Sequence, residues 1–220
     1  MNKCLTKKPE MIRYFFLLAL SAGCFLFTVV RYLITKNNRF FFLNWNLFLA
    51  AVPWFISLFI SSELLRRKPK VFSIILFLFW FLFFPNTVYI ITDLYYLRNH
   101  SGKLFWYDLV MIMLFSWSGL LFGFFSMEHI EEILKQKVSK VKNIVITCCF
   151  LFICAFGVYL GRDLQWNSWE IFLYPNVIFT DVLDRLIKPL KHARTWSFTL
   201  LMGVFLNALY WPVKIIQKKD

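Results

Sequence analysis

The stretch VFSIILFLFWFLFFPNTVYIITDLYYL, residues 71–97, decides the fold class of this chain. Its first part is an uncharged apolar run that supplies the roughly 20 residues a helix needs to cross a bilayer. Apolar and polar residues do not alternate along it, as they would in a strand of an outer-membrane barrel. The stretch therefore predicts a membrane-spanning helix over about 71–92 that ends in a polar segment.

The same pattern recurs on both sides of this stretch and sets the class of the whole chain. With 60% hydrophobic and 21% aromatic residues, the 220-residue chain is too apolar for a soluble enzyme, a secreted disulfide scaffold or a disordered tail. We expect an all-α polytopic integral membrane helical bundle, with residues 1–220 forming a single membrane domain of about six transmembrane helices. The windows predicted to span the bilayer are about 14–34, 41–61, 71–92, 105–127, 143–161 and 195–213.

The excess of positive charge is interpreted as a signal of membrane orientation. The chain has 25 Lys and Arg against 12 Asp and Glu, a net charge of +13 that in a soluble protein would suggest nucleic-acid binding. In a membrane protein, Lys and Arg gather in the loops that stay in the cytoplasm. When the N-terminus is placed inside, fifteen of the 25 fall on the inner side, including the cluster RRKPK at 66–70. We therefore expect both termini in the cytoplasm and no nucleic-acid partner.

The polar and ionisable residues of the spans concentrate at the outer ends of the helices in this orientation. The outer residues of the second to fifth spans are Asn44, Asn46, Asn86, Tyr89, Thr92, Asp93, Asp108, Arg162 and Asp163. The polar segment RDLQWNSWE at 162–170 follows at the same depth. Polar groups in a bilayer are costly and usually face the bundle interior, so they are candidates for a functional site. We therefore expect any site at this outer level.

Four side chains of the third span share one face. Asn86, Tyr89, Asp93 and Tyr96 are spaced by three, four and three residues, which places them in one stripe on a helix. Pro85, just before them, removes a backbone donor and bends the helix, which frees a carbonyl. In one interpretation Asn86 satisfies that carbonyl and Tyr89 belongs to an interfacial aromatic belt. In the other, the stripe is part of a binding site.

The acidic residues of this outer cluster are the candidates for chemistry. Asp93 and Asp108 are the candidate catalytic residues, and Arg162 lies at a depth where it can pair with Asp93. The same pair also fits a structural role, in which it locks two helices together. His100 is interpreted as a solvated loop residue. No Walker loop, HExxH, GxSxG or paired CxxC motif is present, so the sequence predicts no metal site, identifies no cofactor and leaves open whether the protein is an enzyme.

Two segments outside the predicted spans carry expectations of their own. SWEIFLYPNVIFTDVLDRLIKPL at 168–190 is apolar and aromatic, but its carboxylates make it too polar to span. We expect an interfacial or re-entrant segment near 166–190, either an amphipathic surface helix or a lid over the outer site. EHIEEILKQKVSKVKN at 128–143 has acids first and lysines last, which predicts a solvated helix that continues the fourth span.

Four segments carry a resemblance to a known family. They are NWNLFLAAVPW at 44–54, FPNTVYIITDLYYL at 84–97, FWYDLV at 105–110 and GRDLQWNSWE at 161–170, with PNxxYxxTDL as the specific part. They resemble the bacterial integral-membrane family catalogued as domain of unknown function 1361, over about residues 40 to 210. The resemblance implies a polytopic protein of the bacterial plasma membrane and supplies no activity. The positions that match are Asn46, Pro85, Asn86, Tyr89, Thr92, Asp93, Asp108, Arg162, Asn167 and Trp169.

Two functional hypotheses follow. In the first, the outer cluster binds the head group of a membrane lipid or lipid-linked glycan, with modification of that group by Asp93 or Asp108 left open. The substrate-binding residues would be Asn46, Asn86, Tyr89, Thr92, Arg162, Asn167 and Trp169. In the second, the protein is a non-catalytic membrane subunit that docks and stabilises a partner membrane protein. A transporter is less favoured, because ionisable residues are missing at mid-depth, where coupling sites usually lie.

Overall fold

The computed structural model describes residues 7–62, 69–99 and 102–217, and within these ranges it is helical and contains no strand. Six stretches are long and apolar enough to cross a membrane, so the chain is a multi-pass membrane protein of the predicted all-α class. His100 and most of the basic cluster at 66–70 lie outside the described residues. The six candidate spans are Met11–Thr35, Phe42–Ser61, Lys70–Arg98, Phe105–Lys135, Lys140–Asp163 and Ala193–Ile216.

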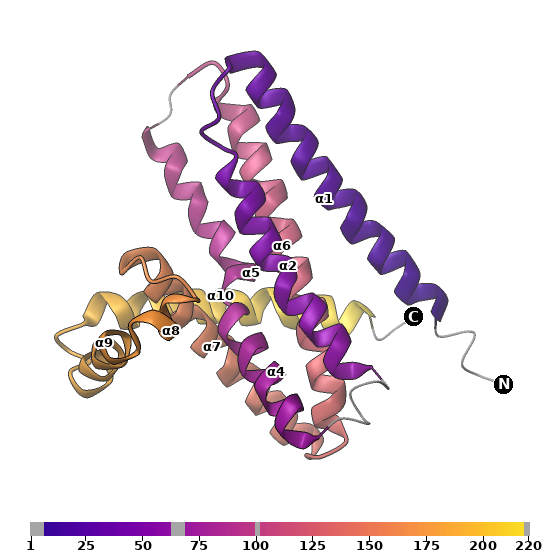
Figure 1. The fold of residues 1–220 in the computed structure, drawn as a ribbon, viewed down its shortest axis with the longest axis vertical. Coiled ribbons are helices and arrows are strands. Elements are labelled where there is room, and N and C mark those ends of the chain that lie inside the picture. Colours follow the sequence, from indigo (N-terminus) through magenta and orange to yellow (C-terminus); the bar gives the residue numbers. More distant parts are fainter. Residues whose placement is uncertain (1–6, 63–68, 100–101, 218–220) are drawn as a thin grey trace.

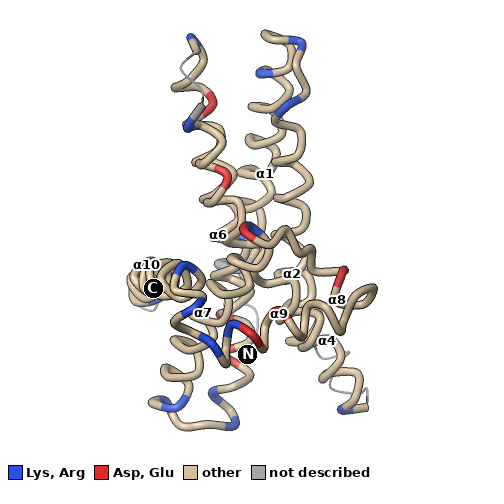
Figure 2. Tube along the Cα trace, turned by 90° about the vertical axis from the view of Figure 1, so that its left-hand side faces the viewer, with Lys and Arg blue, Asp and Glu red and all other residues tan. Residues whose placement is uncertain are grey.

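The helices follow one another with short connections (Figure 1). Their bounds are α1 Lys7–Thr35, α2 Phe42–Ser61, α4 Lys70–Phe83, α5 Asn86–Tyr89, the 3-10 helix η1 Ile90–Asn99, α6 Phe105–Lys135, α7 Lys140–Asp163, α8 Glu170–Leu173, α9 Pro175–Ile187 and α10 Ala193–Gln217. In Figure 2, Lys and Arg gather near the ends of the long helices and in the connections, and much of their length between these ends carries no charge. This distribution is the one expected for spans with apolar middles.

The central helix is α6, which is more buried than any other candidate span. It contributes to two apolar clusters. In one it packs with α1, α2 and η1 around residues such as Leu43 and Phe115. In the other it packs with α4, α7 and α10 around Trp80 and Leu151. In Figure 1, α1, α2 and α6 run obliquely from upper left to lower right, and α10, which packs mainly on α7, lies roughly horizontal in the lower half of the view. The bundle therefore consists of two helix groups that share α6.

The third span is broken where the sequence predicts a bend. α4 ends at Phe83, α5 makes a single turn, and the chain continues as η1. The carbonyl of Phe83 accepts a 3.0 Å hydrogen bond from Asn86 Nδ2, and the carbonyl of Leu82 accepts a 3.2 Å bond from Ser168 Oγ. Both oxygens lie in the last turn of α4 beside the proline break, and the two side chains give them hydrogen-bond donors. The prediction that Asn86 patches the break is therefore confirmed.

Glycines allow the broken segment to approach α6 closely. A Cβ at Gly119 would lie 2.7 Å from the carbonyl oxygen of Thr87, and one at Gly123 would lie 2.6 Å from Thr87 Oγ1. Gly119 and Gly123 are four residues apart, so they share one face of α6. This small-residue spacing is typical of membrane helices whose backbones come into contact. The glycine face of α6 thereby holds α5 in place.

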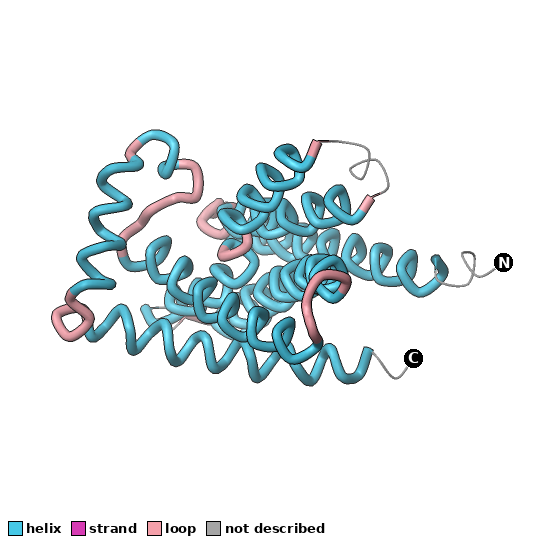
Figure 3. Tube along the Cα trace, turned by 90° about the horizontal axis from the view of Figure 1, so that it is seen from below, coloured by secondary structure: helices cyan, strands magenta, loops and turns pink. Residues whose placement is uncertain are grey.

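The segment near 166–190 forms a loop, the short α8 and the helix α9, set to one side of the bundle where α10 begins (Figures 1 and 3). Phe179, Leu186 and Ile187 of α9 are exposed, whereas Ile178 is buried. A helix with apolar side chains exposed in this way suits the boundary between lipid and water. The segment therefore contains a helix with exposed apolar side chains, and its position at the membrane surface stays a prediction.

The segment that continues the fourth span is helical, as expected, but it is not solvated along its whole length. α6 does continue to Lys135. However, Glu131 is 0% exposed, accepts a 2.7 Å hydrogen bond from Thr147 Oγ1 and forms an ion pair with Lys214 of α10. The acidic and basic order along the segment gave no sign of this burial, because the partner of Glu131 comes from a distant part of the chain.

Candidate functional site

Asp93 joins three helices at the level that the sequence predicts to face outward. Its side chain is 1% exposed. Oδ1 accepts a 2.9 Å hydrogen bond from Arg162 Nη1 of α7, and Oδ2 accepts a 3.0 Å bond from Asn46 Nδ2 of α2. A buried carboxylate requires a positive partner and further hydrogen bonds, and Asp93 has both. The pairing of Asp93 with Arg162 that the sequence predicts is therefore present, and Asn46 completes it.

The guanidinium of Arg162 lies among tyrosine rings. Its Cζ is 4.9 Å from the ring centroid of Tyr96 and 5.8 Å from those of Tyr89 and Tyr95. Each contact is within the range of a cation–π interaction. Because Tyr96 lies three residues after Asp93 in a 3-10 helix, both side chains fall on one face and meet Arg162 together. Arg162 thus fastens η1 to α7 through charge and aromatic contacts.

A small polar pocket of about 110 Å³ lies beside this ion pair. Its polar lining comes from Trp45, Asn46, Asn86, Tyr89, Trp166, Asn167, Ser168 and Trp169. Asn86 Nδ2 donates a 3.1 Å hydrogen bond to Ser168 Oγ, which ties the break in the third span to the 164–169 loop. Among the described residues that line the polar pocket, none is charged. The pocket therefore presents neutral amides, hydroxyls and indoles, with the Asp93–Arg162 pair behind them.

An apolar pocket of about 230 Å³ adjoins the polar pocket. Phe81 of α4, Phe150 and Ile153 of α7, Ile171 of α8 and Val182 of α9 line it. The two pockets share part of their wall. The residues that line both are Pro85, Gly157, Trp166, Asn167 and Ser168. The structure thus places a neutral polar chamber directly beside an apolar one.

The wall between the pockets depends on a second glycine face. A Cβ at Gly157 would lie 2.7 Å from Pro85 Cγ, and one at Gly161 would lie 3.4 Å from Tyr89 Cε2. Gly157 and Gly161 are four residues apart in α7, the same spacing that α6 uses on Thr87. The segment 85–89 is therefore held between glycine faces of α6 and α7. This repeated spacing could have identified Gly157 from the sequence.

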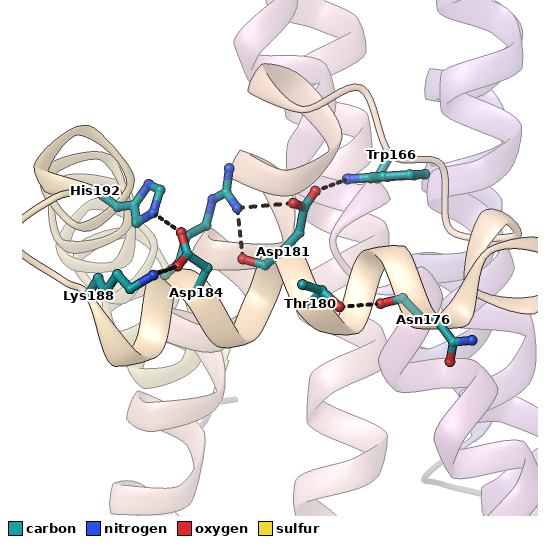
Figure 4. Close-up of polar contacts among 8 residues, drawn as sticks. Trp166, Asn176, Thr180, Asp181, Asp184, Lys188 and His192 are labelled. Atoms are coloured by element: carbon teal, nitrogen blue, oxygen red, sulfur yellow. Dashed lines mark hydrogen bonds and ion pairs between the residues drawn. The ribbon is translucent and has the colours of Figure 1, made fainter.

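The helix α9 is tied to the pocket loop by polar contacts (Figure 4). Trp166 Nε1 donates a 3.0 Å hydrogen bond to Asp181 Oδ2, and Arg185 Nη1 donates a 2.7 Å bond to the carbonyl of Asp181. One turn later, Asp184 accepts hydrogen bonds from Lys188 Nζ at 2.6 Å and from His192 Nε2 at 2.7 Å. These two bonds lower the pKa of Asp184 to about 2. The contacts keep α9, with Ile178 and Val182, against the apolar pocket.

Asp108 belongs to a different contact. Its oxygens accept bonds from Arg31 Nε at 2.5 Å and Arg31 Nη2 at 3.0 Å, a bidentate ion pair between α1 and α6. Asp93, by contrast, contacts α2 and α7. The two candidate catalytic carboxylates thus have separate partners, and both oxygens of each are occupied. Arg31 was not among the predicted residues, because its position within the first apolar window gave no sign of a carboxylate partner.

The remaining predicted residues divide between the pocket and the backbone. Asn167 and Trp169 line the polar pocket. Thr92 Oγ1 donates to the carbonyl of Tyr89 at 2.6 Å, so its hydroxyl is used within its own helix turn. Trp45, Trp166 and Ser168 line the pocket although the sequence did not single them out. Within the described residues, no three His, Cys, Asp or Glu side chains are grouped so that they could hold a metal ion.

Comparison with known proteins identifies a family without an assigned activity. The model of a family described as a protein of unknown function, DUF1361, matches residues 45–209. This match confirms the family resemblance predicted from the sequence, and its range includes every residue that lines the polar pocket. No curated protein and no solved structure matches the chain.

Proposed function

Because the chain belongs to the DUF1361 family of proteins of unknown function, we propose its role from the geometry of the site: it binds a lipid or lipid-linked glycan. The head group occupies the polar pocket, and the hydrocarbon chain occupies the apolar pocket. The observation that carries this proposal is the common wall of Pro85, Gly157, Trp166, Asn167 and Ser168. A ligand that fills both chambers must be polar at one end and apolar at the other.

The lining of the polar pocket favours a neutral head group rich in hydroxyls. Asn46, Asn86 and Asn167 line it, and an amide side chain can both donate and accept hydrogen bonds, as hydroxyl groups do. Trp45 and Trp169 add flat apolar faces with a polar edge. A charged head group would meet no charged side chain in this lining. A sugar or glycerol head group therefore suits the polar pocket better than a bare phosphate.

In this proposal the Asp93–Arg162 pair has a positioning role. Asn46 donates to Asp93 and also lines the polar pocket, and Tyr89 contacts Arg162 and also lines it. Each member of the pair thus holds a pocket residue in place. Because both oxygens of Asp93 already accept hydrogen bonds, the proposal is one of binding and includes no reaction step.

We further propose that the protein lies in a bacterial plasma membrane with both termini inside, so that the polar pocket opens near the outer surface. The test uses Lys70→Cys and Lys103→Cys in a chain whose five native cysteines are replaced by alanine. An impermeant maleimide applied to intact cells should label position 103, and it should label position 70 only after the membrane is opened. The reverse pattern would show that the orientation is wrong.

The binding proposal is tested by the lipids that remain on the purified full-length protein. Native mass spectrometry in a mild detergent should detect an amphipathic molecule bound to the wild type. Trp169→Ala removes an aromatic wall of the polar pocket, and we expect about a tenfold loss of occupancy at equal protein concentration.

The matched control is Trp106→Ala, which removes an exposed tryptophan that lines neither pocket. It should leave the bound molecule in place. Equal loss in the two variants, or a wild type that carries no amphipathic molecule, would refute binding in the polar pocket.

A further inference from the structure

A further pocket, separate from the polar and the apolar one, lies at the opposite ends of the helices. The C-terminal ends of α6 and α10 meet the N-terminal end of α7 there and enclose about 410 Å³. Lys135, Lys140 and Lys214 line this basic pocket together with Asn143 and Trp211. Asn143 and Gly161 lie 18 residues apart along α7, or about 27 Å at the helical rise of 1.5 Å per residue. Along α7, the basic pocket is thus separated from the polar pocket by about the thickness of the hydrocarbon core of a bilayer.

Lys214, one of the lysines that line the basic pocket, is held in a fixed position. Lys214 is 8% exposed and pairs with Glu131, which is 0% exposed. Its Nζ lies 4.5 Å from the ring centroid of Trp211 and 5.3 Å from that of Tyr210. Buried ion pairs contribute little net stability, because removing the charges from water offsets their attraction. The Glu131–Lys214 pair is therefore explained better by positioning than by stability: Glu131 holds the ammonium group of Lys214 at the wall of the pocket.

The charge of the basic pocket is positive overall. Glu131 balances Lys214, and Lys135 and Lys140 add two positive charges at the rim. No carboxylate belongs to the described residues that line the pocket. The first turn of the 24-residue α7 also lies there, and the N-terminal end of a helix carries a partial positive charge. An anion is therefore the expected ligand.

Asn143 indicates that the ligand also carries a hydrogen-bond donor, which a simple anion lacks. Its side chain is 4% exposed and lines the pocket, and its buried Oδ1 accepts no hydrogen bond from any described residue. A buried acceptor without a donor is costly, so such groups are usually satisfied by protein, water or ligand. Phosphate oxygens cannot donate to Oδ1, but a hydroxyl can. The ligand should therefore carry a hydroxyl as well as an anionic group.

Apolar side chains next to the lysines indicate that this ligand is a lipid. Ile144 and Ile215 line the basic pocket and are 39% and 58% exposed. A hydrocarbon chain can lie against them while the head group stays with the lysines at the helix ends. Basic pockets between membrane helices are known to hold the phosphates of anionic lipids.

We propose that the basic pocket binds an anionic phospholipid of the phosphatidylglycerol class. Its phosphate lies against Lys135, Lys140 and Lys214, and a head-group hydroxyl donates to Asn143. This proposal does not depend on the function proposed for the polar pocket, since the two pockets share no residue.

The test measures lipid binding to the delipidated full-length protein by native mass spectrometry. Dioleoylphosphatidylglycerol should bind at least tenfold more tightly than dioleoylphosphatidylcholine. Lys135→Ala combined with Lys140→Ala should weaken phosphatidylglycerol binding about thirtyfold, since each lysine near an anionic head group contributes about a factor of five. Both side chains are exposed, so the double variant should fold.

The matched control replaces Lys137 and Lys142, two exposed lysines of the same segment that do not line the pocket. The control should bind phosphatidylglycerol within twofold of the wild type. An equal loss of binding in both double variants would show that general surface charge, and not the basic pocket, attracts the lipid. That result would overturn the proposal. Trp169→Ala, in the polar pocket, should leave this binding unchanged.

Two further measurements separate the possible sources of the anion. Inorganic phosphate at millimolar concentration should not displace the lipid; if it does so fully, the pocket is a phosphate site and the lipid assignment is wrong. Phosphatidylmethanol carries the same charge without a glycerol hydroxyl. Wild type should prefer phosphatidylglycerol to it, and Asn143→Leu should abolish that preference. A preference that survives in Asn143→Leu would overturn the role of the hydroxyl.

Discussion

Gly157 of α7 lies against Pro85 so closely that a Cβ at Gly157 would come within 2.7 Å of Pro85 Cγ. This contact joins the break in the third span to the α7 backbone, and both residues line the polar and the apolar pocket. The proline ring is rigid and cannot move aside as a long side chain would. The division between the two pockets therefore depends on the absence of a side chain at position 157.

Gly157→Ala should lower stability by about 1–3 kcal/mol, because the added methyl group overpacks a rigid contact. Thermal unfolding of the purified protein in detergent measures the change. Gly23→Ala is the matched control, since a Cβ at Gly23 meets no atom within 4 Å and alanine favours the helix. If the two variants unfold at the same temperature, the close packing at Pro85 does not exist.

Asp93→Asn should lower stability by about 3 kcal/mol, because it leaves the guanidinium of Arg162 partly buried without its carboxylate. Replacing Arg162 by Gln as well should restore part of the loss. Folded Asp93→Asn protein should carry the amphipathic molecule at reduced occupancy, because Asn46 loses the carboxylate that holds it in the pocket wall. A variant with wild-type stability that has lost this molecule would show instead that Asp93 contacts the ligand directly.

Asp108→Asn should act on α1 and leave the pockets intact. The change breaks the bidentate ion pair with Arg31, so we expect a loss of stability similar to that of Asp93→Asn. Native mass spectrometry should show unchanged lipid occupancy for the folded fraction. Reduced occupancy at unchanged stability would place Asp108 in the binding site, as the sequence suggested.

The contacts that Asp184 makes at the end of α9 should be lost at low pH, when its carboxylate becomes protonated. Its pKa is lowered to about 2 by Lys188 and His192, below its value in the unfolded chain. The stabilisation is therefore present above the unfolded pKa and is lost as the pH falls through about 2. The carboxyl carbon of Asp184, assigned by its disappearance in Asp184→Asn, should titrate near pH 2 in nuclear magnetic resonance spectra. A midpoint near the ordinary aspartate value would show that the two bonds are absent.

The pairing of Asp93 with Arg162 could be predicted because hydropathy gives the depth of a residue, and both residues lie at one depth. The same reasoning also placed Asp108 in this cluster, yet Asp108 pairs with Arg31. Depth is one coordinate, whereas the direction in which a side chain points around the bundle axis depends on how the helices pack. Residues at equal depth can therefore belong to different contacts.

The apolar runs by themselves determined the helical class, the six spans and the level at which the polar residues of the spans gather, because a bilayer requires about 20 apolar residues for each crossing. Only the tertiary structure decided which polar groups meet. Residues that lie far apart in the sequence meet at the glycine faces that hold 85–89, at the wall between the two pockets and in the Glu131–Lys214 pair. Their contacts depend on the packing of several helices at once, which no single stretch of sequence specifies.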